Sequence, residues 1–356
     1  MLHCHDAAWA IKRQSLIRSK APILVGPFEG ELGIEVLYWL SFLRGLMSPR
    51  HVEPILPTEQ APEPLPPLID PSRIIPISRA GAASFYGTPT GIELFAMRTM
   101  QDLRVENGVR ARTTGMIKQM AWTPFDRKVV QDVAQTLELK EYQTLHPLWM
   151  YRTLHPYWLL QRGLGWLGKR IPYAFFLPPP PLPDPIPLPE QFLAIKFYFR
   201  STFPYRHEVL QLAKRVVDQL SEQHPVTILN TGLHADDHAD MAFKAKPNVL
   251  LLRDMATITP ENGLQWQGAV IARALGFVGT YGGLAQLAQR FKRPAVTFYT
   301  DWGGTSMAHK HLSDMIAIRT QVPFVVLDVK ECPLVRSLLP PFEVRTGLTT
   351  AQELIS

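Results

Sequence analysis

The chain has 356 residues, of which 46% are hydrophobic and 19% are charged, and its formal net charge is +6. This composition excludes a disordered chain, and the length allows two domains that each bury a core. Two cysteines are too few for a disulfide framework, and neither a signal peptide nor a membrane-spanning stretch is recognisable, so we expect a cytoplasmic protein. The positive charge is too mild and dispersed to indicate nucleic acid, but it suits an anionic ligand.

The first half of the chain starts as an α/β unit. Apolar runs predict strands at Ile23–Val25 and Ile74–Ile77, and helical periods predict helices at Glu31–Leu46, Ile92–Leu103 and Pro124–Leu137. Between the strands, Pro54–Pro71 is rich in proline and is expected to be loop.

A stiff connector is predicted at Pro178–Pro189, where eight of twelve residues are proline. Such a segment cannot form a helix or a central strand and favours an extended conformation. A ligand for a proline-recognition domain is an alternative, which its mid-chain position disfavours.

The second half alternates short apolar runs with helical periods, which predicts a parallel sheet with helices on both faces. The predicted strands are Phe192–Phe199, Val226–Asn230, Asn248–Leu252, Gly276–Gly279, Ala295–Tyr299 and Phe324–Asp328, and the predicted helices are His207–Gln223, Gly263–Leu275 and Leu284–Phe291. We therefore expect two Rossmann-like domains, residues 1–177 and 191–356, joined by residues 178–190, with the ligand in the cleft between them.

A glycine turn between a strand and a helix is the most informative motif. Thr280, Tyr281, Gly282 and Gly283 connect the strand that ends at Gly279 to the next helix. Backbone N–H groups and the helix dipole make such a helix start a binding site for an anion such as phosphate. The alternative is a purely structural turn, since glycine is common between strands and helices.

This segment resembles the donor-binding segment of GT-B glycosyltransferases, in particular the heptosyltransferase-type enzymes. The matching residues are Gly279, Thr280, Gly283, Leu284, Gln286, Leu287 and Ala288, followed by Lys292, Arg293 and Pro294. The family's aspartate is replaced, and Gln286 stands where the family has histidine, although its amide can still donate to a phosphate oxygen. The resemblance implies a nucleotide-sugar donor on the second domain and an acceptor on the first.

Further donor-binding residues are predicted at the same sheet edge. Lys196 and Arg200 lie in and just beyond the first strand of the second domain, and the resemblance implies that a basic residue there reaches the donor diphosphate. Asn230 and Gly232 end the next strand, at the edge where open α/β sheets bind ligands. The alternative for Lys196 is an edge strand on which its side chain points to solvent.

Three glutamates, Glu29, Glu31 and Glu35, surround the start of the first long helix. The helix dipole favours Glu31 without any function, but it does not explain Glu35 in a helix that is apolar nearly all round. The stretch Gly30–Glu35 resembles the acidic loop of the family, which implies a general base for the acceptor hydroxyl. We assign Glu31 as the base, Glu35 as its partner or an acceptor ligand, and Glu29 as the reserve.

We expect no metal and no cofactor, because cationic side chains and N–H groups can stabilise the leaving diphosphate. The stretch His234–Asp240, "HADDHAD", has a spacing that could ligate a metal, but a solvated loop beside the donor is favoured. A loose basic run, Arg98, Arg104, Arg110 and Arg112, indicates a solvated helix face, and contact with an anionic acceptor is the alternative.

The segment Tyr142–Phe176 contains three tryptophans and four arginine or lysine residues, but no aspartate or glutamate. Such a composition is typical of the headgroup level of an anionic membrane, although an ordinary core is an equally good explanation.

The sequence thus predicts a metal-independent glycosyltransferase of hexosyl or heptosyl type in polysaccharide biosynthesis. The expected acceptor is a glycan or a lipid-linked glycan, and the enzyme is expected to be peripheral to the membrane. A sugar-nucleotide epimerase and a non-catalytic binding protein on the same scaffold are the alternatives.

Overall fold

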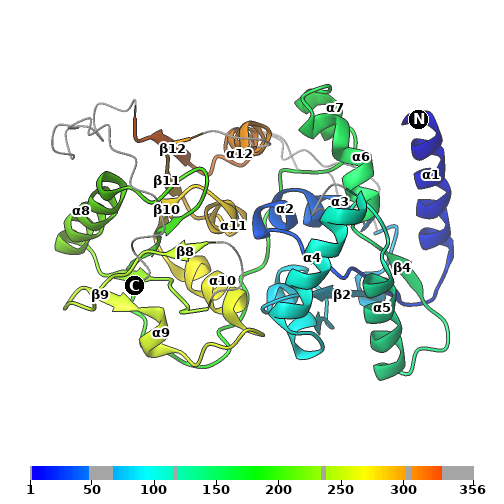
Figure 1. The fold of residues 1–356 in the computed structure, drawn as a ribbon, viewed down its shortest axis with the longest axis horizontal. Coiled ribbons are helices and arrows are strands. Elements are labelled where there is room, and N and C mark those ends of the chain that lie inside the picture. Colours follow the sequence, from blue (N-terminus) through cyan, green and yellow to red (C-terminus); the bar gives the residue numbers. More distant parts are fainter. Residues whose placement is uncertain (1, 48–66, 115–118, 234–237, 302–305, 331–356) are drawn as a thin grey trace.

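The computed structural model describes residues 2–47, 67–114, 119–233, 238–301 and 306–330, and Figure 1 shows their arrangement in two lobes. No helix in these ranges is long and apolar enough to cross a membrane.

The N-terminal lobe is built on a parallel four-stranded sheet in the order β3-β2-β1-β4. Its strands are β1 (Ile23–Val25), β2 (Ile74–Ser78), β3 (Ile92–Glu93) and β4 (Gln143–Leu145). Its helices are α1 (Leu2–Arg18), α2 (Leu32–Ile34), α3 (Leu40–Met47), α4 (Met100–Thr114), α5 (Pro124–Thr136), α6 (Leu148–Trp158) and α7 (Leu164–Gly168). Short 3-10 turns, η2 (Pro71–Arg73), η3 (Ala82–Phe85) and η4 (Leu94–Ala96), complete the lobe.

The C-terminal lobe has a parallel six-stranded sheet in the order β12-β11-β10-β5-β7-β9. Its strands are β5 (Leu193–Lys196), β7 (Val226–Ile228), β9 (Val249–Leu251), β10 (Gly276–Thr280), β11 (Ala295–Tyr299) and β12 (Phe324–Asp328). When the six strands are numbered by their place in the chain and the sheet is read from β9 to β12, their order is 3-2-1-4-5-6. This is the strand order of dinucleotide-binding Rossmann folds. The predicted fold class, two Rossmann-like α/β units, is therefore confirmed.

The helices of this lobe are α8 (His207–Gln223), α9 (Leu252–Met255), α10 (Gly263–Arg273), α11 (Gly283–Arg290) and α12 (Ser306–Thr320). A small antiparallel pair, β6 (Tyr198–Phe199) and β8 (Ala239–Asp240), lies beyond the carboxyl end of β5. The predicted strand Phe192–Phe199 is thus wrong in extent, because the chain leaves the main sheet after Lys196.

The helix predicted at Ile92–Leu103 is wrong in its first half. Residues Ile92 and Glu93 pair with β2 instead, and the helix begins at Met100. The Glu93 carboxylate accepts hydrogen bonds from the backbone N–H groups of Ala80, Gly81 and Phe95, at 2.6 to 3.0 Å. These three bonds hold Glu93 in a turn and compete with helix formation.

The predicted helix Glu31–Leu46 is continuous from Leu32 to Met47 but contains a π-helical turn, η1, at Glu35–Trp39. The loop expected at Pro54–Pro71 lies largely outside the described residues. Residues 169–192, which include the predicted connector, contain neither helix nor strand. Helices α1, α6, α7, α9 and α12 were not predicted.

One hydrophobic core cluster is shared by the two lobes, beside a separate cluster in each. A single cluster of buried side chains runs from Val25 and Trp39 in the first lobe to Leu287 and Phe291 in the second. Helix α11 packs against α2 and η1. Figure 1 shows α11 and α2 side by side between the two sheets.

Candidate functional site

The turn before α11 lies at the junction of the two lobes. Gly282 is extended, and a Cβ there would lie 2.1 Å from the Tyr198 hydroxyl. A Cβ on Gly283 would lie 2.7 Å from the backbone nitrogen of Gly33 in α2. Both glycines are therefore required by close approach, one to a side chain and the other to the opposite lobe.

Thr280 holds the chain above this turn. Its hydroxyl donates to the Tyr198 carbonyl and accepts from the Tyr198 N–H, both at 3.1 Å. The Tyr281 ring is buried against the Phe324 ring, and burial raises the pKa of its hydroxyl. The predicted residues Thr280 and Tyr281 thus shape the turn through buried contacts.

Arg200 and Glu31 meet across the lobes at this turn. The distance from Arg200 Nη2 to Glu31 Oε2 is 3.9 Å, and Arg200 Nη1 is 3.7 Å from the Cβ position of Gly282. The Glu31 side chain is 58% exposed, whereas that of Arg200 is 22% exposed. A cation beside the start of an eight-residue helix can bind an anion there.

Gln286 lies one turn into α11 and is 2% exposed. Its amide nitrogen is 3.5 Å from the Tyr281 hydroxyl, and its oxygen has no hydrogen-bond partner among the described residues. That oxygen lies 2.7 Å from the Cβ position of Gly33, so it is aimed at α2. A buried acceptor without a donor is costly, which makes this oxygen a candidate contact for a ligand hydroxyl.

Lys196 is buried and forms an ion pair with Asp240, with 2.6 Å between Nζ and Oδ1. Burying the ammonium is tolerated because the carboxylate compensates it. The end of the "HADDHAD" stretch therefore serves as the counterion of Lys196, and the His238 ring stacks on Tyr198 at 4.5 Å. Residues 234–237 lie outside the described residues, and the described part of the chain contains no group of three potential metal ligands.

Asn230 and Gly232 follow β7 at the same sheet edge. The Asn230 amide donates to the Met241 carbonyl at 2.7 Å, while its oxygen has no partner among the described residues. Gly232 is exposed and has a φ of 74°, a left-handed conformation that glycine adopts without strain.

Glu35 is fully buried in the N-terminal lobe. One carboxylate oxygen accepts from the hydroxyls of Ser78 and Tyr86, each at 2.6 Å, and the other has no hydrogen-bond partner in the described chain. Burial raises the pKa of Glu35, and the positive charge of Arg79 opposes this. Glu35 opens the π-helical turn η1, and its side chain does not reach solvent.

Glu29 is buried in a network of charges at the carboxyl edge of β1. Arg110 donates to both oxygens of Glu29, at 2.7 and 3.3 Å, and to Asp126 at 2.6 Å. The Oδ2 atom of Asp126 in turn lies 3.2 Å from Nε2 of His146, which follows β4. Burial raises the pKa of Glu29 to about 7 although Arg110 opposes the shift. The prediction that Arg110 lies on a solvated helix face is wrong, because its guanidinium neutralises these buried acids.

Sequence reasoning missed Asp126, His146 and the pairing of Arg110 with Glu29. The capping box formed by Thr123 and Asp126 can be recognised in the sequence as a helix start. It does not reveal that Asp126 also pairs with Arg110 and lies beside His146. A search for the counterion of a buried glutamate would have pointed to the basic run on α4.

The comparisons with known proteins give a distant likeness. No family model and no curated protein matches the sequence. Among solved structures, an E. coli heptosyltransferase, WaaC with ADP, is 13% identical with a TM-score of 0.35, over 84% of this chain and 99% of that chain. The glycosyltransferase SnogD from Streptomyces nogalater is 12% identical with a TM-score of 0.34, over 90% of each chain. At these scores the likeness carries no argument about individual residues.

Proposed function

We propose that this chain is a glycosyltransferase that moves a sugar from a nucleotide-sugar donor to a hydroxyl group of a glycan or lipid-linked acceptor. The observation that carries the proposal is the convergence of the α11 start, Arg200 and Glu31 at the junction of two Rossmann-like lobes. Cationic and N–H groups suit the leaving diphosphate, and an exposed carboxylate suits the attacking hydroxyl.

In this proposal the donor diphosphate binds beside Gly282 and Gly283, where the first N–H groups of α11 and the Arg200 guanidinium supply positive charge. The Gln286 oxygen accepts a hydroxyl from the donor. Asn230 and Gly232 border the nucleoside end of the site, at the edge of the sheet. Lys196 acts through its ion pair with Asp240, which anchors β8 and with it the His238 ring above Tyr198.

Glu31 is the proposed base, because it is the exposed carboxylate of the three and lies within ion-pair distance of Arg200. Glu35 and Glu29 are positioning residues in this proposal. Glu35 orients η1 through Ser78 and Tyr86, and Glu29 fixes the segment after β1 through Arg110.

The proposed activity uses no divalent ion, since Arg200 and the helix start balance the diphosphate. Activity with an added sugar donor should survive excess chelator. If chelator abolished transfer and Mg²⁺ or Mn²⁺ restored it, a metal-dependent mechanism would replace this one.

The donor site is tested by calorimetric titration of nucleoside diphosphates. Arg200→Gln should weaken binding about tenfold, as expected for the loss of one charge-assisted hydrogen bond. Arg253→Gln is the matched control, since Arg253 is an exposed arginine on α9 of the same lobe. Equal affinity of Arg200→Gln and the wild type would refute the donor site.

A membrane surface is proposed as a partner at the tip formed by α6 and α7. Leu159 and Leu160 are exposed there, and Arg162 and Lys169 are also exposed in this segment. The Arg170 guanidinium stacks on the half-buried Trp166 at 3.8 Å. By contrast Tyr151, Tyr157 and Trp158 of the same segment are buried, so this part of the segment is core. Apolar and basic side chains at one tip suit anionic lipid.

Reversing the charge of Arg162, Lys169 and Arg170 together should abolish low-salt binding to vesicles that contain anionic lipid. A sedimentation assay with neutral vesicles is the control. If the wild-type protein did not sediment with anionic vesicles, the acceptor would be soluble.

A further inference from the structure

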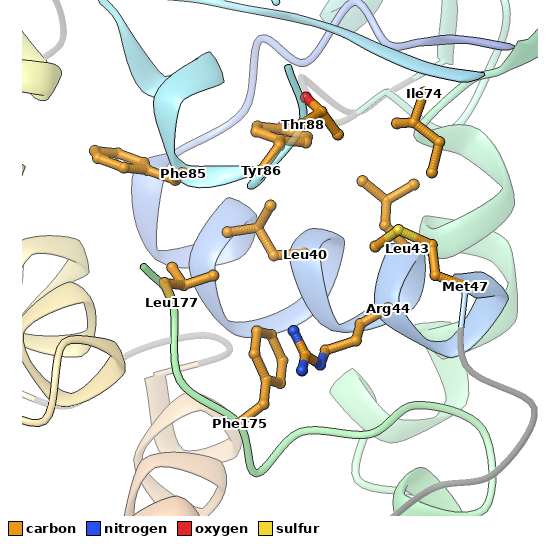
Figure 2. Close-up of a pocket in the computed structure, with 10 residues that line it drawn as sticks. All are labelled: Leu40, Leu43, Arg44, Met47, Ile74, Phe85, Tyr86, Thr88, Phe175 and Leu177. Atoms are coloured by element: carbon orange, nitrogen blue, oxygen red, sulfur yellow. The ribbon is translucent and has the colours of Figure 1, made fainter. Parts of the chain in front are cut away.

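The cavity drawn in Figure 2 is too small for an organic ligand. It lies between α3, Tyr86 and Phe175, and its volume of about 20 Å³ has room for about one or two water molecules. A sugar needs far more space. The polar groups that can contact a sugar lie instead beside Glu31, the proposed base.

One of these groups is the hydroxyl of Tyr151, on the first turn of α6 after β4. The residue is only 2% exposed, and its ring packs against the Trp158 ring with 5.3 Å between the ring centres. The hydroxyl lies 2.9 Å from the position that a Cβ on Gly30 would take. Because residue 30 is glycine, the hydroxyl can approach the backbone that leads directly to Glu31.

The Tyr151 hydroxyl forms no hydrogen bond with the residues that the structure describes. Buried tyrosine hydroxyls usually have a partner, as the Tyr157 hydroxyl on the same helix does, which donates to the Ala308 carbonyl at 2.8 Å. Unlike the unpaired oxygens of Gln286 and Asn230, the Tyr151 hydroxyl is not sealed from solvent. It is therefore open to a ligand.

Four charged residues act on this hydroxyl. Burial raises the pKa of Tyr151, and the negative charge of Glu31 makes the largest electrostatic contribution to the rise. Arg110 and Arg79 oppose the rise, and Glu35 adds to it. The phenol is therefore neutral and presents an O–H donor, whereas an ionised carboxylate such as that of Glu31 presents only acceptors.

The backbone between these two groups is held by hydrogen bonds. The Arg79 guanidinium donates to the Gly30 carbonyl, and the Gln119 side-chain oxygen accepts from the Glu29 N–H at 3.0 Å. These bonds restrict the loop that places Glu31 beside the tyrosine, so a ligand meets a donor and an acceptor that are already in place.

We propose that Tyr151 binds and orients the acceptor, and that the group held between Tyr151 and Glu31 is a sugar hydroxyl. A sugar hydroxyl both accepts and donates a hydrogen bond, so its oxygen can accept from Tyr151 while its proton is directed at Glu31. This role rests on the proposed glycosyltransferase function and adds a contact residue on the acceptor side.

The transfer step then balances without a further reactant. The hydroxyl proton passes to Glu31, and the hydroxyl oxygen forms a bond to the anomeric carbon of the donor. The bond from that carbon to the nucleoside diphosphate breaks, and its electron pair leaves on the diphosphate oxygen. Tyr151 keeps its own proton throughout, so it orients the nucleophile and does not act as a base.

The hydroxyl can be observed by ¹⁹F NMR of the full-length protein in which fluorotyrosine replaces all ten tyrosines. Tyr151→Phe assigns the Tyr151 resonance by its loss, and Tyr157→Phe assigns a control resonance in the same way. The probes are the methyl α-glycosides of glucose, galactose and mannose, which differ in the orientation of their hydroxyl groups. We expect at least one probe to shift the Tyr151 resonance in a saturable manner and to leave the Tyr157 resonance unchanged.

Two variants test the geometry. Glu31→Ala should raise the Kd of the responding glycoside about tenfold, since a charge-assisted hydrogen bond is lost, whereas Glu141→Ala, at an exposed glutamate of the same lobe, should not. Tyr151→Phe should raise that Kd about fivefold in a calorimetric titration. It should keep the wild-type Tm, because the hydroxyl makes no bond in the described chain, whereas Tyr157→Phe loses an internal bond and should lower Tm.

The role of Tyr151 would be overturned if none of the three glycosides shifted its resonance, if the response were the same in Glu31→Ala, or if Tyr151→Phe lowered Tm. These outcomes are separate from those of the donor titration. If nucleoside diphosphates bound and no glycoside were sensed, the proposed function would stand without Tyr151. If a glycoside were sensed and no nucleotide bound, the sugar contact at Tyr151 would stand and the transferase activity would not.

Discussion

At the scale of single residues, the buried acids of the N-terminal lobe show how the fold supplies partners for carboxylates that the sequence leaves unexplained. Glu29 and Glu35 drew attention because a carboxylate in an apolar setting needs a reason. The structure supplies the reason inside the lobe, through Arg110 for Glu29 and through Ser78 and Tyr86 for Glu35. Sequence could indicate the need for a partner, but it could not identify partners that lie 43 to 81 residues away along the chain.

Glu29 should make stability depend on pH. Its pKa in the folded state is raised from 4.5 to about 7, mainly by burial, with Arg110 opposing and Asp126 and Glu106 adding to the shift. The folded state therefore holds this proton more tightly than the unfolded state. The corresponding stability is fully present below pH 4.5 and is lost as the pH rises to about 7.

Glu29→Gln should flatten this part of the stability profile, because the glutamine does not titrate. Urea unfolding at intervals from pH 4.5 to pH 7 measures the effect. Glu141→Gln, an exposed glutamate of the same lobe, is the control and should keep the slope. An unchanged slope in Glu29→Gln would mean that Glu29 is ionised throughout this range.

Glu31→Gln tests the proposed base. It should lower kcat by about 10²- to 10⁴-fold, the usual contribution of general base catalysis. Donor affinity and Tm should stay near those of the wild type, since Glu31 is exposed and its ion pair with Arg200 is long. Measurement of transfer rate beside donor titration separates the two effects, and retained activity would exclude Glu31 as the base.

At the scale of elements, the π-helical turn η1 explains why Arg290 is buried: its guanidinium donates to a backbone carbonyl of that turn. A π turn disturbs the regular ladder of helix hydrogen bonds, and the Val36 carbonyl within η1 accepts from the Arg290 guanidinium at 3.2 and 3.3 Å. The same guanidinium also reaches the segment after α7. One side chain of α11 therefore joins three segments.

Arg290→Met should destabilise the protein by about 3–5 kcal/mol, comparable with breaking a buried charged network, because several buried carbonyls lose their donor. Urea unfolding measures the change. Arg253→Met, at an exposed position, should cost less than about 0.5 kcal/mol. A similar small loss for both variants would mean that water replaces the guanidinium.

Element prediction succeeded where a buried strand or an amphipathic helix follows its own local pattern. The six strands of the C-terminal sheet and the helix starts at His207 and Pro124 were found in this way. It failed where a tertiary contact decides the conformation. Glu93 is held by a turn in another segment, and the chain after Lys196 leaves its sheet to pair with β8. For the candidate site, sequence predicted the glycine turn and Arg200, while the Lys196–Asp240 pair and the position of Tyr198 required coordinates.

At the scale of the whole molecule, the lobes are joined by polar as well as apolar contacts. The Tyr38 hydroxyl lies 2.8 Å from His309 of α12, and the Tyr157 hydroxyl donates to the Ala308 carbonyl at 2.8 Å. The carbonyl of Ala80 accepts from the N–H groups at the start of α10. Together with the shared core, these contacts couple the stability of one lobe to that of the other.

We therefore expect both lobes to unfold in a single cooperative transition. Ile195→Ala is a suitable probe, because Ile195 is fully buried in a separate core cluster of the C-terminal lobe, and the change should cost about 2–5 kcal/mol. Hydrogen exchange should then accelerate by the same factor for the amides of β1 and of β10, although β1 belongs to the other lobe. The exposed substitution Arg253→Gln should alter neither. Faster exchange in β10 with unchanged exchange in β1 would show that the lobes unfold independently and that their shared core adds little coupling.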